Sequence, residues 1–234
     1  MTTDEPLPRA LEILWRDGPA TRRTRGLNRE RIVAAAIELA DSDGLAALSM
    51  GRLAERLKCG TMSLYRHVAN KDELLMFMLS TAPDPPPNTN RTNWRGALTD
   101  WACGLWDVYH RHPWVLQATA AAGPPADPGQ LAWLDAGLAA LEATELAERD
   151  KLAAVMAVLH FVRGAVALDI EGAPDDAPEY PALLRRVLDP ERFPALAAAV
   201  EAGVFDDAND DHLAEFRSGL DQLLDGIDAK VGRR

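Results

Sequence analysis

The sequence predicts an all-α protein made of a small amino-terminal helical head and a larger helical body. Apolar residues recur at three- and four-residue spacing through most of the chain, and no segment shows the alternation that is typical of a strand. Stretches dense in Pro and Gly, among them PDPPPN at 83–88 and GPPADPG at 123–129, separate the helical segments. With 234 residues and 47% hydrophobic content, the chain is long enough to bury such a core.

Residues 1–27 predict a flexible basic arm. They begin with Pro6 and Pro8, pass through a short amphipathic stretch, and end in the run TRRTRG. Residues 16–31 carry six Arg against two acidic side chains. We expect Trp15 to pack against the head.

The first helix of the head is predicted from Asn28 to about Asp43. Asn28 is a good N-cap residue, and Gly44 is a typical helix stop. The apolar face between them carries Ile32, Ala35, Ala36, Leu39 and Ala40.

Two shorter helices follow, joined by a tight connection. Ser49 caps the first of them, which ends near Lys58, and the connection runs through Cys59 and Gly60. Thr61 or Ser63 is expected to cap the second. Two short helices joined by a Gly-containing turn form a helix-turn-helix. Their apolar anchors are Leu53, Ala54, Leu57, Leu64 and Val68.

The second of these helices has the side chains of a DNA-recognition helix. Its front edge is Thr61, Met62 and Ser63, which are adaptable enough to approach base edges in a major groove. Donors that reach phosphate oxygens surround it, namely Arg52, Tyr65, Arg66, His67 and Lys71. The alternative is a solvated hairpin in which Tyr65 and His67 only pack or cap. The joint pattern favours DNA binding.

A fourth helix opens at Lys71, Asp72 and Glu73, where acidic side chains favour a helix start. It ends before the Pro-rich linker at 83–88. The body is then predicted as a helix from Trp94 that breaks at Pro113, a short helix to about Ala122, and further helices. The first of these further helices is capped by Asp127 and carries a stripe of Leu131, Leu134, Leu138 and Leu141. A long helix is predicted over 147–171, weak helices within 172–208, and a last helix over 211–231.

The net charge of −11 argues against a nucleic-acid binder until it is divided along the chain. Residues 1–75 carry 12 basic and 11 acidic side chains, which leaves 13 basic and 25 acidic side chains for residues 76–234. The acidity belongs to the body. For the basic arm, two interpretations stay open: an arm that inserts Arg into a minor groove, or a solvated tail.

Catalytic and metal chemistry have no support in the sequence. Cys59 and Cys103 lack a metal or redox spacing, the five His are scattered, and no nucleophile elbow or phosphate-binding Gly loop is present. We expect no catalytic residue, metal or cofactor. The amino terminus lacks the basic start and long apolar run of a secretory leader, so we expect a cytoplasmic protein.

The phrase LYRHVANKDELL at 64–75, after LAERL at 53–57, resembles the signature of the TetR family of bacterial transcriptional regulators. The resemblance implies a DNA-binding domain with its linker helix at 28–78 and an effector-binding and dimerisation domain at 90–234. It implies that Thr61, Met62 and Ser63 face bases and that Tyr65, His67 and Lys71 hold the DNA backbone. Ser49 and Arg52 complete the set of predicted DNA-binding residues. Two departures are Lys58 where the turn usually has Gly, and Gly51 where the tetracycline repressor carries a base-contacting Arg.

The body is similar to the tetracycline-repressor-like branch of the family, through HPW at 112–114, GPP at 123–125 and LHFVRGAVALDIE at 159–171. This resemblance implies a homodimer formed by the helices near 147–171 and 211–231. A dimer is also expected physically, because one short recognition helix buries too little DNA to specify a site.

Aromatic and polar residues in the body predict a cavity for a small-molecule effector. His160 matches a pocket histidine of that branch, but by itself a core or interface histidine is the favoured interpretation. The metal-binding histidine of the tetracycline repressor falls near Gln117 or Ala118 here, so magnesium-tetracycline is not the expected effector. The candidate pocket residues are Trp101, Trp106, Tyr109, Trp114, Met156, His160, Phe161 and Arg163.

The sequence therefore predicts a repressor that binds a palindromic double-stranded operator and leaves it when a small, largely apolar molecule binds the body. An activator or a ligand-independent regulator would share every feature of the head. A small-molecule-binding protein without DNA function and an oligomeric scaffold are the remaining alternatives.

Overall fold

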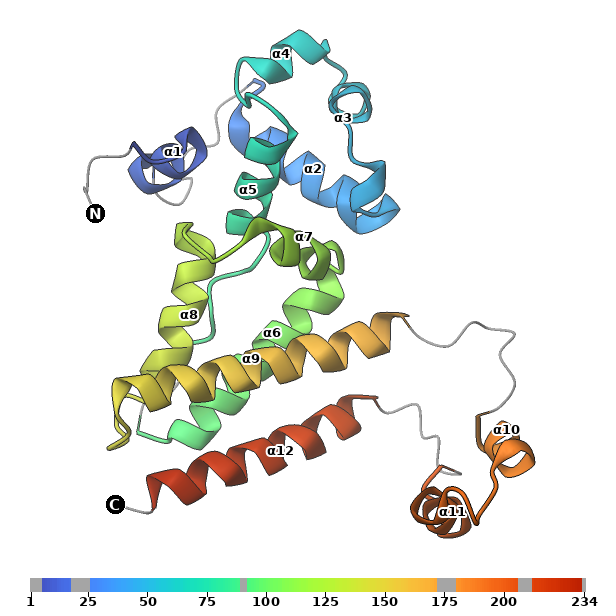
Figure 1. The fold of residues 1–234 in the computed structure, drawn as a ribbon. Helices are drawn as coiled ribbons and strands as arrows, with labels where there is room; N and C mark the ends of the chain where they lie inside the picture. The colour runs from blue at the N-terminus through green and yellow to red at the C-terminus, as the bar shows by residue number, and fades with distance from the viewer. Residues whose placement is uncertain (1–5, 18–25, 89–91, 172–179, 206–211, 233–234) are drawn as a thin grey trace.

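The computed structural model describes residues 6–17, 26–88, 92–171, 180–205 and 212–232. Every regular element in these ranges is a helix, which confirms the all-α prediction. Figure 1 shows the head at the top, the body below it, and helix α5 running from one into the other.

The head is built from α2 (Arg29–Asp43), the short 3-10 turn η1 (Leu45–Ala47), α3 (Met50–Arg56) and α4 (Thr61–Tyr65). The predicted caps at Asn28 and Ser49 are confirmed, because each side-chain oxygen accepts a backbone N–H three residues on. Gly44 ends α2 with a positive φ of 78°. The core between these helices includes Ile32, Ala36, Leu53, Leu64 and Val68, all fully buried.

The turn between α3 and α4 keeps the conformation that glycine favours although it lacks glycine there. Lys58 has a φ of 53°. Its N–H donates to the Glu55 carbonyl, and the Cys59 N–H donates to the Ala54 carbonyl, each at 3.0 Å. This pair of bonds is the Schellman arrangement that closes a helix. The substitution of Lys58 for the usual Gly therefore leaves the turn intact, at the cost of left-handed backbone strain.

Helix α5 (Lys71–Thr81) begins at Asn70, whose side chain accepts the Glu73 N–H. Leu74, Phe77 and Met78 are buried almost completely. The helix packs against α1 and α2 on the side of the head and against α7 and α8 of the body. It therefore joins the two parts through its side chains as well as through the chain.

The expectation of a flexible arm over residues 1–27 is wrong for the segment that forms helix α1 (Arg9–Asp17). Ala10 and Leu11 are buried, and both guanidinium contacts from Arg9 Nη1 to the Glu73 carboxylate measure 2.9 Å. Amphipathic spacing outweighed the flanking prolines, because α5 offers an apolar face to cover. The basic run at 18–25 lies outside the described residues.

Trp15 does not pack into the head as expected. Its indole N–H donates to the Ala126 carbonyl in the loop before α8, at 3.0 Å, and half of its surface remains exposed. Helix α1 thus touches both the linker helix and a loop of the body.

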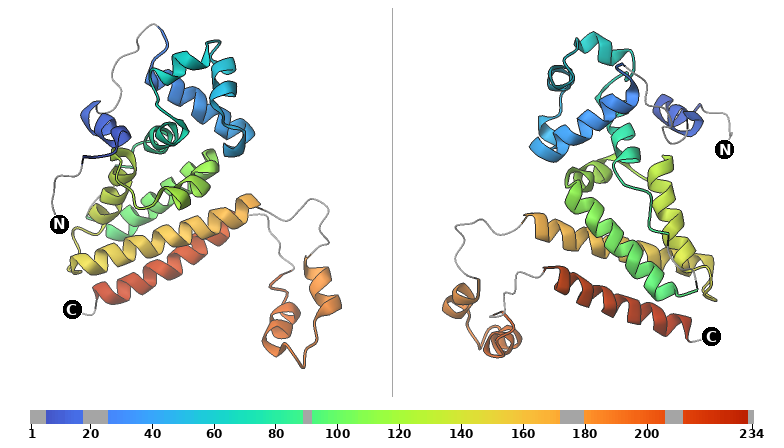
Figure 2. Two further views of the ribbon diagram at one scale, coloured as in Figure 1. Left: turned by 45° about the horizontal axis from the view of Figure 1, so that its top comes forward. Right: turned by 180° about the vertical axis from the view of Figure 1, so that it is seen from behind.

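The body consists mainly of α6 (Trp94–Arg111), α7 (Trp114–Ala122), α8 (Pro128–Ala140), α9 (Glu148–Glu171) and α12 (His212–Val231). The predicted breaks at Pro113 and Ala122 and the Asp127 cap are confirmed. Helices α9 and α12 lie side by side in all three views of Figures 1 and 2 and are in contact.

Helix α8 buries a face that includes only the last leucine of the predicted stripe. Trp133, Gly137, Ala140 and Leu141 are buried, whereas Leu131, Leu134 and Leu138 are only partly so. Gly137 explains the difference, because a Cβ there would lie 2.9 Å from the Trp101 ring. Close approach to α6 at a glycine turns Leu131, Leu134 and Leu138 away from the centre of the core.

The short helices α10 (Tyr180–Val187) and α11 (Pro194–Glu201) confirm the weak helices expected within 172–208. They pack on each other and project away from the body (Figure 2). Residues 172–179 and 206–211 lie outside the described residues.

Replacing Lys58 with Gly should stabilise the protein. Gly adopts a φ near 53° without the Cβ strain of Lys58, although it also adds entropy to the unfolded chain. We expect a net gain of about 0.5 to 1 kcal/mol in the free energy of unfolding, measured by urea denaturation. Lys58→Ala is the control, because it removes the charge but keeps the Cβ. Equal stability of the two variants would contradict the strain argument.

Candidate nucleic-acid interface and body cavity

Helix α4 presents its predicted base-contacting edge to solvent. Leu64 is fully buried and anchors the helix, while 73% of the Met62 surface is exposed. Thr61 is exposed and Ser63 is half-buried. Leu64 is therefore the side chain that anchors α4 in the head core, and the front edge of the helix remains accessible to a partner.

The expectation that Thr61 or Ser63 caps α4 is wrong. The N-cap is Gly60, which has no side chain that could cap the helix, and the Ser63 N–H donates to the Gly60 carbonyl at 2.9 Å. Backbone geometry alone starts the helix. The hydroxyl groups of Thr61 and Ser63 are consequently not used as caps and are available as donors or acceptors.

Arg52 and Ser49 lie at the start of α3, and both are exposed. Arg52 pairs with the Asp43 carboxylate and donates to the Ala47 carbonyl at 3.3 Å. Hydrogen bonds from Ser42 and then Arg52 hold the pKa of Asp43 below its ordinary value. An ionised Asp43 thus competes with phosphate for Arg52.

The other candidate phosphate contacts follow α4 directly. Tyr65 is 46% exposed, Lys71 is exposed at the first position of α5, and His67 is half-buried. The Val68 anchor between them is fully buried and fixes this segment against the head core. Six of the eight predicted DNA-contact residues lie on α3, α4 and the first position of α5; Ser49 is the N-cap of α3 and His67 lies in the turn after α4, and none of the eight is fully buried.

The body encloses a cavity of about 190 Å³ between α5, α6, α7, α8 and α9. Leu79 and Pro83 line it at the end of α5, and Trp133 and Gln130 line it from α8. Its wall is mainly apolar with a few polar groups, which is the usual composition of a small-molecule site. Four predicted pocket residues line it: Trp101, Tyr109, Met156 and Arg163.

Sequence reasoning missed the cavity residues contributed by α5 and by the segment directly after it. Leu79 and Pro83 read as ordinary helix and linker residues, and only packing of α8 against α5 brings them to the cavity. Gly129 marks this approach, because a Cβ there would lie 2.1 Å from the Ser80 carbonyl oxygen. A glycine inside GPPADPG was the available signal.

Trp106, His160 and Phe161 do not line this cavity. The Trp106 and Phe161 rings pack on Phe216 of α12, with ring centroids 4.4 and 5.7 Å apart. His160 is exposed. Trp106 and Phe161 hold α6 and α9 against α12, so helical spacing identified these two as packed side chains but assigned them to the wrong side of the core. The expectation that His160 is a core histidine is wrong for the single chain, because its side chain is exposed.

Trp114 joins the body to the head instead of facing the cavity. Its indole N–H donates to Asp41 Oδ1 of α2 at 2.7 Å, and His112 Nδ1 lies 2.8 Å from the same oxygen. Trp114 and His112 are both buried. This polar contact attaches the start of α7 to the end of α2.

Burial raises the pKa of the Tyr109 phenol above its ordinary value, and the nearby Arg163 guanidinium only partly opposes the shift. Tyr109 therefore stays neutral near pH 7 and is a hydrogen-bond donor in the cavity wall. Among the described residues, no group of three or more His, Cys, Asp or Glu is placed to hold a metal ion. The cavity is equipped for recognition through apolar contact and a few hydrogen bonds.

An exposed recognition helix on a compact three-helix head, joined by a buried helix to a body with an internal cavity, defines a DNA-binding transcriptional regulator. The comparisons with known proteins agree. Residues 32–76 match the family described as "Bacterial regulatory proteins, tetR family", and residues 86–231 match "Tetracyclin repressor-like, C-terminal domain".

Similar proteins cover nearly the whole chain. The HTH-type transcriptional repressor DrrR1 of Streptomyces coeruleorubidus is 33% identical over 97% of this chain and 88% of its own length. An HTH-type transcriptional regulator of Saccharopolyspora erythraea is 34% identical over 99% of this chain and 96% of its own. The TetR family protein ActR of Streptomyces coelicolor, in complex with actinorhodin, matches with a TM-score of 0.74 at 25% identity, over 89% of this chain and 100% of ActR.

The chain belongs to the TetR family of bacterial transcriptional regulators. The family predicted from the sequence is thereby confirmed.

Proposed function

We propose that this protein represses transcription from a palindromic operator and leaves the operator when a small molecule occupies the body cavity. The observation that carries the proposal is the contribution of Leu79 and Pro83 to the cavity wall. Leu79 lies in the last turn of α5 and Pro83 two residues after its end, while the other end of the helix carries Lys71 of the head. A ligand in the cavity therefore touches the element that holds the head.

Release requires that the ligand bind one head arrangement better than another. A molecule that fills the cavity pushes on the last turn of α5 and on α8, which approach each other closely at Gly129. In a dimer, tilting α5 changes the distance between the two recognition helices. A fixed operator spacing then no longer fits.

The effector is proposed to be compact and largely apolar. The cavity of about 190 Å³ is smaller than the range of roughly 300–1,000 Å³ that is usual for drug-sized ligands. Thr119, Tyr109, Gln130 and Arg163 supply its polar contacts. Gln117 does not line it, which agrees with the expectation that a magnesium-tetracycline complex is not the effector. ActR, which was crystallised in complex with actinorhodin, supports an organic small molecule as the class of ligand.

We assign base contacts to Thr61, Met62 and Ser63 and phosphate contacts to a second group. The exposure of α4 and the free hydroxyl groups described above support the first assignment. The second group donates to the DNA backbone from either side of α4 and comprises Ser49, Arg52, Tyr65, His67 and Lys71.

The proposed homodimer uses α9 and α12. Helix α9 is long and apolar enough over Glu148–Ile170 to cross a membrane by length and composition alone, a test that core helices also pass, yet only 28% of its apolar window is buried in one chain. Leu152 is 44% exposed and Leu168 is 79% exposed. Apolar surface of this extent is typical of a subunit interface.

A repressor is preferred over an activator because the similar proteins with an assigned direction are named repressors. We further propose that the protein acts in the cytoplasm, where the DNA lies, and is not an enzyme. The test is to select bound DNA from a random pool and then to screen small apolar compounds for release of the selected duplex. A chain that selects no duplex would reject the proposal.

Lys71→Ala should weaken binding to all duplexes alike, because a phosphate contact carries no sequence information. The slope of log affinity against log salt should flatten by about one unit. Fluorescence anisotropy with the selected duplex at several salt concentrations measures both. Arg186→Ala, exposed on α10 and outside the proposed dimer helices, is the control that removes an equal charge. The assignment fails if the two variants behave alike.

Thr119→Trp should fill the cavity and make the repressor insensitive to the compound found in the screen. Operator affinity should be the same with and without the compound, because the indole already occupies the space that the compound would enter. Ala120→Trp is the matched control, because Ala120 is exposed on the same helix and does not line the cavity. Release that persists in Thr119→Trp would move the effector out of this cavity.

Leu168→Asp should weaken the dimer, because a carboxylate would be desolvated at the proposed interface. Sedimentation velocity should show a dissociation constant raised by roughly tenfold or more. Leu7→Asp is the control, since Leu7 is 54% exposed and lies outside α9 and α12. An unchanged dimer in Leu168→Asp would exclude this face.

A further inference from the structure

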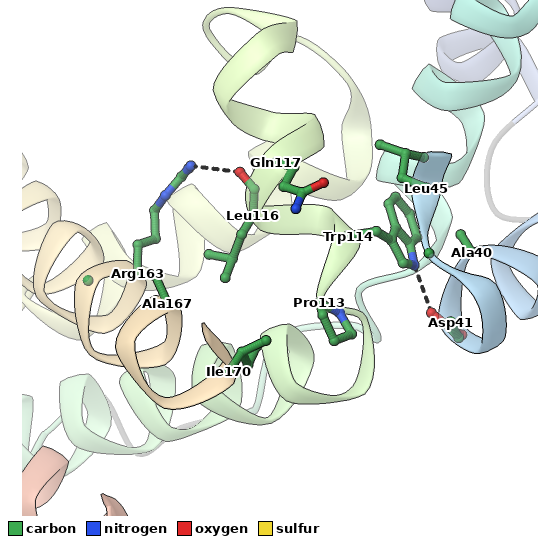
Figure 3. A pocket seen from close by; sticks show the side chains of 12 residues that line it. Ala40, Asp41, Leu45, Pro113, Trp114, Leu116, Gln117, Arg163, Ala167 and Ile170 are labelled. Atoms are coloured by element: carbon green, nitrogen blue, oxygen red, sulfur yellow. Dashed lines mark hydrogen bonds between the residues drawn. The ribbon is translucent and has the colours of Figure 1, made fainter. Parts of the chain in front are cut away.

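A second and larger hollow lies outside the body cavity, in a cleft between head and body. Its volume is about 490 Å³, within the range of small-molecule sites. Ala40, Asp41 and Leu45 form the head side (Figure 3). Helices α7 and α9 form the body side. Helix α7 therefore separates two hollows, with Val115 and Thr119 on the cavity and Leu116 and Gln117 on the cleft.

Much of the cleft wall is apolar and accessible. Ile170 is 39% exposed, and in Figure 3 it lies at the bottom of the view, with Ala167 to its upper left and with Pro113, the Trp114 ring and Leu45 to its upper right. The indole is fixed by its hydrogen bond to Asp41, so it presents a rigid aromatic wall. A flat apolar molecule is the shape that such walls accommodate.

Arg163 supplies a cation on the α9 side of the cleft. The side chain is partly buried, and its Nη2 donates to the Leu116 carbonyl at 3.2 Å. Within the described residues, no carboxylate forms an ion pair with it. A guanidinium has five N–H donors, and a partly buried one is stabilised by an anion that accepts two of them.

The acidic group of the cleft is the Asp41 carboxylate, and one of its oxygens already has hydrogen-bond partners. Asp41 Oδ1 is shared by Trp114 and His112, so this carboxylate serves the contact between head and body. The positive and negative groups therefore lie on opposite walls. An anionic ligand is attracted to the Arg163 wall and kept from the Asp41 wall, which fixes its orientation.

We propose that this cleft is a second ligand site, which takes a planar aromatic molecule carrying one anionic group. The anion binds Arg163, and the rings lie between Ile170 and the wall formed by Trp114 and Leu45. Such a molecule touches the head and the body at once. Its binding does not depend on the function proposed above, whereas any effect on operator affinity does.

Two dyes that differ mainly in charge test the site on the full-length chain. The anionic probe is 1-anilinonaphthalene-8-sulfonate, and the neutral probe is N-phenyl-1-naphthylamine. Fluorescence titrations give the affinity and the number of sites for each. Ala167→Phe fills the cleft from α9, and Gln117→Trp fills it from α7, so misfolding or altered assembly of one variant does not remove the test. Ala120→Phe, exposed on α7 and outside both hollows, is the control.

In Ala167→Phe, Gln117→Trp and Arg163→Gln, we expect the protein to bind one fewer molecule of the anionic probe, or to bind the probe about tenfold more weakly. Arg163→Lys, which keeps the positive charge, should bind this probe better than Arg163→Gln does. The neutral probe should be unaffected by Ala167→Phe and should be lost in Thr119→Trp. An anionic-probe isotherm that is the same in the wild type, Ala167→Phe and Gln117→Trp would overturn the proposal, because it would show nonspecific surface binding only. Failure of operator release leaves these isotherms unchanged, so the two proposals fail separately.

Discussion

Burial of α5 on both sides is the constraint on which the rest of the structure depends. Leu74, Phe77 and Met78 lose nearly all contact with water, and they do so among residues of both head and body. Glu73 adds a polar centre at the start of the helix, since its carboxylate accepts the Arg9 guanidinium and the Ala69 N–H just after the recognition segment. Because interiors are close-packed, α5 cannot shift without a matching shift in its neighbours.

A second connection between head and body runs through α7. Trp114 and His112 hold its first turn to Asp41, and its two faces line the cavity and the cleft. Arg163 lies on the wall of both hollows. The head is thus connected to the body in two ways: α5 continues the chain from one into the other, and the contact of Trp114 and His112 with Asp41 joins α7 to α2. Both connections border a space that a ligand can occupy. Two bordering hollows give the fold more than one place where binding energy can bias the head.

The distribution of charge fits this division. The acidic side chains are concentrated after residue 75, so the body repels the DNA backbone while the head is close to neutral overall and carries its exposed donors around α4. Association with DNA is therefore directed to one end of the molecule. The same acidity would oppose dimer formation if it were spread evenly, but the exposed face of α9 carries Leu152 and Leu168.

Local sequence signals determined the helices, their caps and the head. Asn28, Ser49 and Asp127 act within three residues of themselves, and the spacing of apolar residues repeats with each helical turn, so both are visible without a fold. The same signals failed for Thr61 and Ser63, where Gly60 starts the helix through backbone geometry. They also failed for the amino-terminal arm, where α1 depends on a surface of α5 that is distant in sequence.

The cavity was decided by the tertiary structure alone. Aromatic spacing indicated that Trp101, Trp106 and Phe161 are buried or partly buried, but not which neighbour each one contacts. In the structure, Trp106 and Phe161 pack on Phe216 of α12. Leu79 and Pro83 reached the cavity because Gly129 lets α8 approach α5. Helix formation and family membership follow from interactions within a few residues, which the sequence records directly. Which walls enclose a hollow depends on contacts between helices far apart in the chain, and those are fixed only when the helices pack.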